Sequence, residues 1–173
     1  MINKIVISVD GSEGAERAVA FAASIASKAQ AAIVLIHVLL RSVPNGEMRE
    51  IACRLGFLDS VRDEMEKSMV PKLAAARAGA GVAIYDVLDD TLKLFGNRIL
   101  DHAAALITDK TLSISKQIAD DDPATAILHC IEKEQADMVV VASRGLGPMV
   151  GLIVGSVSQK LVQSAPCACL IVK

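Results

Sequence analysis

Two apolar segments near the start of the chain, with an amphipathic helix pattern between them, restrict the folds available to it. The segments Lys4–Val9 and Ala31–Leu40 are rich in Ile and Val and almost continuously apolar. Such runs are typical of strands buried on both faces of a parallel sheet. Between them, Ser12 can cap a helix reaching about Lys28, with alanines along one face. Strand, helix and strand together predict a right-handed parallel βαβ unit.

The rest of the chain continues this alternation. Further strands are expected over Thr111–Ile118, Met138–Ala142 and Ala168–Val172, and helices over Asp89–Leu106, Ala124–Glu134 and Ser156–Ser164. A long charged helical stretch is expected over about Met48–Ala78, either kinked or interrupted at Pro71. The sequence therefore predicts an α/β fold with a doubly wound five-stranded parallel sheet. We interpret residues 1–173 as a single domain with a helical insertion around residues 41–110, because one helix suffices between neighbouring parallel strands.

Composition and charge argue against several classes of protein. A net charge of −2 without a basic block argues against nucleic acid as a partner. No apolar run approaches the ~20 residues of a membrane span, and the first residues lack the pattern of a secretory signal. We therefore expect a cytoplasmic protein without a membrane partner. The four cysteines and three histidines lack metal-ligand spacing, so no metal site is predicted.

A glycine-containing loop connects the fourth strand to the last helix. It reads Ala142-Ser143-Arg144-Gly145, then nine residues, then Gly155-Ser156. Glycine lets the backbone approach a ligand, and the free N–H groups and dipole of the following helix favour an anion. The loop is thus predicted to bind phosphate, but it fits neither the P-loop nor the dinucleotide fingerprint. Asp10 follows the first strand, so both features face one crevice if these strands are neighbours at the switch point.

These residues resemble the universal stress protein family, specifically its ATP-binding branch. The family signature is Gly-x-x-Gly, nine residues, then Gly-Ser/Thr. The chain matches it at Gly145, Gly155 and Ser156, with Ala142 replacing the first glycine. Further similar segments are Ser8–Ser12, His37–Val38 and Ala165–Cys167. The resemblance covers Ile2 to about Leu40 and Ala119 to Lys173.

The resemblance implies a Rossmann-like sheet of the adenine nucleotide alpha hydrolase type with strand order 3-2-1-4-5. It implies ATP as the ligand, with AMP or ADP as alternatives and Mg²⁺ or Mn²⁺ beside the phosphates, and a homodimer through the C-terminal strand. Asp10 would lie beside adenosine, Val38 against adenine, and the loop residues along ribose and phosphates. The full set of implied binding residues is Ser8, Asp10, Val38, Ala142, Arg144, Gly145, Gly155, Ser156 and Val157.

Several residues have a second, purely structural interpretation. Asp10 could cap the following helix, Arg144 could be a solvated loop residue, and Ser156 could be a helix cap, as could Ser158. If position 142 needs a positive φ or very close backbone approach, alanine costs on the order of 1 kcal/mol or more there. If it needs only a small residue, which we favour, alanine is harmless.

Three functions are compatible with these patterns. The first is an ATP-binding regulatory module of the stress response with little or no nucleotide turnover. The second is a slow ATPase or phosphotransferase, although no clear general base stands near the loop, so no catalytic residue is predicted. The third is a nucleotide-free homodimeric adaptor, in which Ala142 marks a decayed site.

Overall fold

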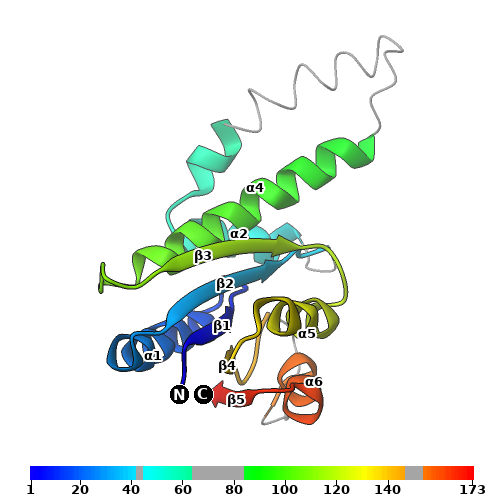
Figure 1. Cartoon of the computed structure of the whole chain (residues 1–173). Helices are drawn as coiled ribbons and strands as arrows, with labels where there is room; N and C mark the ends of the chain where they lie inside the picture. The colour runs from blue at the N-terminus through cyan, green and yellow to red at the C-terminus, as the bar shows by residue number, and fades with distance from the viewer. Residues whose placement is uncertain (42–44, 64–83, 147–153) are drawn as a thin grey trace.

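The structure, a computed structural model, describes residues 1–41, 45–63, 84–146 and 154–173. Its centre is a parallel sheet of five strands in the order β3-β2-β1-β4-β5 (Figure 1), which confirms the predicted fold class and strand order. The strands are β1 (Lys4–Ser8), β2 (Ala32–Val38), β3 (Ile114–Ala119), β4 (Met138–Ala142) and β5 (Ala168–Val172). The helices are α1 (Glu13–Ala29), α2 (Asn45–Arg54), α4 (Ile84–Ala105), α5 (Pro123–Glu134) and α6 (Ser156–Ser164).

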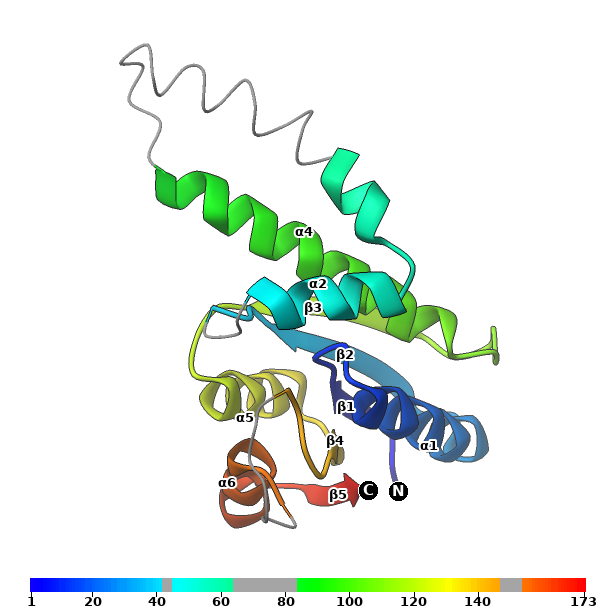
Figure 2. The same cartoon turned by 180° about the vertical axis from the view of Figure 1, so that it is seen from behind.

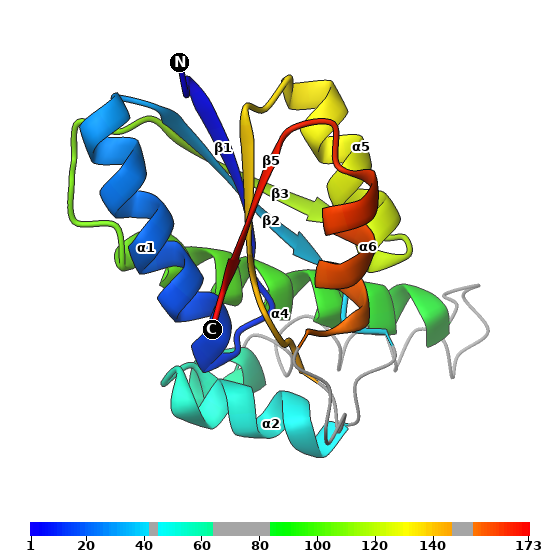
Figure 3. The ribbon, with the colours of Figure 1, turned by 90° about the horizontal axis from the view of Figure 1, so that it is seen from below.

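Helices cover both faces of the sheet (Figure 3). Successive strand residues point to opposite faces, so Ile5 and Ile7 join one buried cluster while Val6 joins the other. The first cluster contains buried residues of α1, α2 and α4, and the second contains residues of α5 and α6. The near-continuous apolar strands predicted from the sequence are thus buried on both sides, as a doubly wound sheet requires.

The start of α1 follows the predicted capping chemistry. Ser12 has an extended backbone, and its Oγ accepts a hydrogen bond from Ala15 N at 3.2 Å. Glu13 and Glu16 in the first turn suit the positive end of the helix dipole. The helix ends at Gln30, which adopts the left-handed conformation with φ of 54°. The hydrogen bond between Ser12 and Ala15 therefore fixes the turn after β1 to the first turn of α1.

The predicted helix over Met48–Ala78 is wrong in its described part, because α2 ends at Arg54. Gly56 is left-handed, with φ of 73°, and its N–H donates to Cys53 O at 3.1 Å. Phe57 N donates to Ala52 O at 3.0 Å, which completes a Schellman-type helix end. A new helical segment follows over residues 58–63. The remainder of the predicted helix, including Pro71, lies outside the described residues.

Other boundaries also differ from the prediction. The third strand begins at Ile114 rather than Thr111. The reason is that the Asp109 carboxylate accepts hydrogen bonds from Thr111 N at 3.0 Å and Thr111 Oγ1 at 2.7 Å, which keeps this segment in a turn. Helix α4 begins at Ile84, five residues before the predicted Asp89, and ends one residue before Leu106.

Candidate functional site

A cavity of about 640 Å³ lies beyond the carboxyl ends of the central strands. At this point the chain leaves the neighbouring strands β1 and β4 toward opposite faces of the sheet: β1 leads to α1 on one face, and β4 leads to α6 on the other. This is the switch point at which ligands bind in open α/β sheets. All the residues that the sequence pointed to lie in its lining: Ser8, Asp10, Val38, Ala142, Arg144, Gly145, Gly155, Ser156 and Val157.

Asp10 connects the two loops on either side of the switch point. Its Oδ1 accepts a hydrogen bond from Ser12 N at 2.9 Å, and its Oδ2 accepts one from Leu146 N at 3.0 Å. A Cβ built on Gly145 would lie 2.5 Å from Asp10 Oδ2, so this contact requires glycine. The side-chain cap of α1 is Ser12, whereas the Asp10 carboxylate links the turn after β1 to the glycine loop by its hydrogen bond from Leu146 N.

Ala142 ends β4 without backbone strain. The non-glycine residues with positive φ in the described part of the chain are Gln30 and Gln135, so Ala142 is outside the left-handed region. Its methyl group faces the first turn of α1, where a Cβ built on Gly14 would come within 3.1 Å of it. Of the two costs considered for alanine at position 142, a positive φ is therefore absent.

The first turn of α6 lacks a side-chain cap. Its N-cap is Gly155, which makes no capping hydrogen bond, and the turn contains no acidic residue. Ser158 instead donates its hydroxyl to Ala142 O at 3.0 Å, and Ser156 is exposed. The interpretation of these two serines as caps is therefore wrong. The Gly155 N–H donates to Ser143 O at 2.7 Å, so among the described residues the amides that follow it, in the first turn of α6, are the ones left for an anion at the cavity.

The acidic turn between β3 and α5 is part of the cavity lining, which the sequence did not predict. Arg41 forms a bidentate pair with Asp120, with both N–O distances 2.5 Å, and also lies 2.9 Å from Asp89. The hydrogen bonds from Arg41 lower the pKa of Asp120. A signal existed in the sequence, because this turn follows a strand whose carboxyl end faces the crevice.

The charges of the lining are unevenly distributed. Among the described residues, its carboxylates are Asp10, Asp120, Asp121 and Asp122, and its guanidinium groups are Arg41 and Arg144. Hydrogen bonds from Thr125 and then Lys160 lower the pKa of Asp122 to about 2, so this group stays ionised. Arg41 is occupied by carboxylates, while Arg144 is exposed next to the glycine loop. The loop end of the cavity is thus the favourable end for an anion.

His37 lies on the opposite face of β2 from the cavity-lining Val38. It is 1% exposed, and its Nδ1 lies 2.8 Å from Val9 O. Burial lowers the pKa of His37, which favours the neutral ring. Its Nε2 has no hydrogen-bond partner among the described residues, and the ring packs against Gly96 of α4. The histidine belongs to the interior and takes no part in the cavity.

The described residues contain no group of three or more His, Cys, Asp or Glu side chains placed to hold a metal ion. Over the same residues, no helix combines the length and apolar character needed to cross a membrane.

The sheet order and the switch-point cavity define a Rossmann-like α/β protein. The profile of the universal stress protein family matches residues 1–50 and 57–173. A relative from Thermus aquaticus, the universal stress protein in the QAH/OAS sulfhydrylase 3'region, is 30% identical to this chain. The alignment covers 100% of this chain and 100% of the relative. The chain therefore belongs to the universal stress protein family.

Solved structures of this family share the fold. A universal stress protein family protein from Arabidopsis thaliana with AMP bound has a TM-score of 0.58 at 17% identity, covering 99% of this chain and 91% of that chain. The universal stress protein from Archaeoglobus fulgidus in complex with dAMP has a TM-score of 0.58 at 15% identity, covering 100% of this chain and 98% of that chain.

Proposed function

We propose that this protein binds an adenine nucleotide, ATP foremost, in the switch-point cavity and acts as a regulatory module of the stress response. The observation that carries the proposal is the convergence of the Asp10 turn, Val38 and the glycine loop on one cavity. Its volume of about 640 Å³ falls within the ~300–1,000 Å³ of typical small-molecule sites. Two solved members of the family hold AMP or dAMP.

Gly155 supplies a second argument. Its φ of −75° is accessible to any residue. A Cβ built there would come no closer than 3.5 Å to any described atom, which is ordinary van der Waals contact. The described part of the fold therefore gives no reason for glycine at this signature position. Close approach of a phosphate group to the backbone supplies one.

Divalent cations fit this proposal through charge. The described part of the lining has four carboxylates and two guanidinium groups, so an ATP molecule without a cation would meet net repulsion there. Mg²⁺ or Mn²⁺ bound mainly by phosphate oxygens would reduce that charge. In the described lining, both oxygens of Asp10 accept backbone hydrogen bonds, and no histidine is present to position an attacking water. These features favour binding over turnover, with at most slow ATP hydrolysis.

The test is calorimetric titration of nucleotide-stripped protein with ATP, with and without Mg²⁺, and with AMP. We expect saturable binding, stronger for ATP when Mg²⁺ is present. Gly155→Ala should keep the melting temperature and weaken binding, and Gly145→Ala should weaken it further by displacing Asp10. Gly46→Ala is the matched control, because a Cβ at Gly46 meets nothing within 4 Å.

The absence of binding at millimolar nucleotide would refute the proposal and favour the nucleotide-free adaptor. If the wild-type protein releases phosphate from ATP faster than the Gly155→Ala variant does, the slow ATPase is favoured instead.

We also propose that two copies pair through β5. This strand ends the sheet, so one of its edges has no strand partner in the described fold. Four of its five residues are half-buried apolar side chains or cysteine, a composition suited to a strand that continues into a second sheet. Sedimentation should show a dimer at micromolar concentration, and a monomer throughout that range would refute the pairing.

A further inference from the structure

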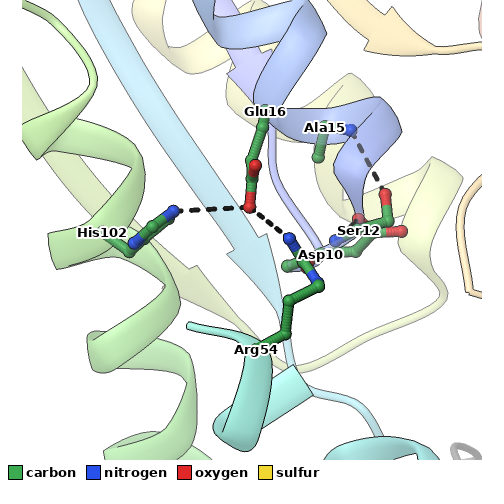
Figure 4. Close-up of polar contacts among 7 residues, drawn as sticks. Asp10, Ser12, Ala15, Glu16, Arg54 and His102 are labelled. Carbon is green, nitrogen blue, oxygen red and sulfur yellow. Dashed lines mark hydrogen bonds and ion pairs between the residues drawn. The ribbon is translucent and has the colours of Figure 1, made fainter. Parts of the chain in front are cut away.

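A polar cluster outside the cavity connects α1, α2 and α4 to the turn that holds Asp10 (Figure 4). Arg54, at the end of α2, donates from Nη1 to Glu16 Oε1 at 2.6 Å and from Nη2 to the Gly11 carbonyl. From α4, His102 Nε2 lies 3.3 Å from the same Glu16 oxygen, at ion-pair distance but without hydrogen-bond alignment. The guanidinium of Arg54 is therefore held between a carboxylate and the backbone of the turn.

Apolar contacts act on the same backbone position. Gly11 is left-handed, with φ of 84°. A Cβ built there would lie 2.8 Å from Cγ2 of Ile51 in α2 and 3.1 Å from Cδ1 of Ile99 in α4. Gly11 thus packs directly against both helices, independently of its hydrogen bond to Arg54.

This turn leads directly to the glycine loop. Gly11 follows Asp10, whose carboxylate accepts hydrogen bonds from Ser12 N and Leu146 N. Contacts therefore run without a gap from α2 through Gly11 and Asp10 to the loop after β4. The cavity lining includes no residue of α2 or α4 among those that the structure describes. The Asp10 turn is one route of contact from these helices to the cavity, and a second route runs from Asp89 of α4 to the cavity-lining Arg41, 2.9 Å away.

We propose that Arg54 is a positioning residue for the nucleotide site, and that docking of α2 on Gly11 sets the affinity for nucleotide. The proposal rests on the proposed function and adds its regulation. Thermodynamic linkage makes the coupling reciprocal, so nucleotide in the cavity also stabilises the docked α2. An effector that contacts α2 or α4 thereby changes nucleotide affinity without touching the nucleotide.

The first test compares AMP affinities by calorimetry. Arg54→Met retains an apolar stem and removes the guanidinium, so we expect the dissociation constant of AMP to rise about 5-fold or more. Arg54→Lys keeps the charge but lacks the planar fork, and should give an intermediate value. Arg62→Met is the control, because Arg62 is 68% exposed and pairs with Asp59 at 3.5 Å, away from the turn. It should bind AMP as the wild type does.

The second test separates positioning from a general loss of structure. In the wild type, saturating AMP should slow hydrogen exchange in residues 46–63, although the cavity lining contains none of them. In Arg54→Met, AMP should still protect residues 143–146 and no longer protect residues 46–63. If Arg54→Met does not fold, Glu16→Gln provides the weaker perturbation, because it replaces the charged acceptor of Arg54 with a neutral amide.

The outcomes are distinguishable. Failure of the wild type to bind any adenine nucleotide refutes the proposed function and this inference together. Binding of AMP by the wild type, with equal affinity in Arg54→Met and unchanged protection of residues 46–63, refutes the inference alone.

Discussion

Replacing Gly96 with alanine tests how α4 packs on the sheet. At an open helical position this substitution stabilises a protein by about 1 kcal/mol, because alanine loses less backbone entropy. At Gly96 the new Cβ would lie 2.7 Å from His37 Cδ2 and 3.4 Å from Ile118 Cδ1. His37 is 1% exposed and in contact with Val9 O through Nδ1, so its ring has little room to give way.

The expected size of the effect follows from two opposing contributions. Overpacking a buried site costs about 1–3 kcal/mol, and the helix propensity of alanine offsets about 1 kcal/mol of that cost. Gly96→Ala should therefore lower the free energy of unfolding by roughly 1 kcal/mol. For a chain of this size, that change lowers the melting temperature by about 2–4 °C. Urea denaturation followed by circular dichroism measures the first quantity, and a thermal melt measures the second.

The decisive comparison uses a background without the histidine ring. In His37→Ala, the added methyl group has space, so Gly96→Ala should now stabilise the protein by up to about 1 kcal/mol. The opposite sign in the two backgrounds is the signature of direct packing. If Gly96→Ala stabilises the wild-type chain, or has the same effect in both backgrounds, the account of the α4 contact is wrong.

Two further predictions concern pH and capping. Burial lowers the pKa of folded His37 below the ordinary 6.5, so its contribution to stability is complete above pH 6.5. As the pH falls below that value, the unfolded chain binds the proton first, and the free energy of unfolding should drop by at most about 1.4 kcal/mol per pH unit. Urea titrations at pH 7 and 5.5 should show this loss in the wild type and a smaller one in His37→Asn; equal losses would contradict it. Ser12→Ala should cost about 1 kcal/mol, since Ser12 Oγ accepts from Ala15 N, and an unchanged denaturation midpoint would contradict this role.

The sequence predicted the fold best where short apolar runs are bounded by polar or turn residues. β4, β5 and α6 have the predicted boundaries, because Asp137 and Pro166 separate their patterns clearly. The long helix over Met48–Ala78 was wrong because its charged periodic pattern continues past Gly56. A single left-handed glycine ends α2 there, and periodicity does not register such a residue.

The cavity was predictable because parallel topology brings the carboxyl ends of the strands together. Asp10, Val38 and the glycine loop could be placed at one edge from their positions after the strands. Arg41 and Asp120 also follow neighbouring parallel strands, so their pairing was accessible to the same reasoning. The pairing of Arg54 with Gly11 was not, because it joins residues 43 positions apart and depends on how α2 docks, which one sequence does not reveal.

The strand order has a consequence for synthesis on the ribosome. β1 lies in the middle of the sheet, but its partner β4 leaves the ribosome more than 130 residues later. The hydrogen bond from Lys4 N to Asp137 Oδ2, which joins the starts of these two strands, spans 133 positions. The helices that cover one face, α1, α2 and α4, emerge early (Figure 2), whereas α5 and α6, which cover the other, emerge last. At about 5–20 residues per second, the nascent sheet spends seconds with Val6, Val34 and Ile36 uncovered. This apolar face is therefore where a nascent-chain chaperone has the most to protect.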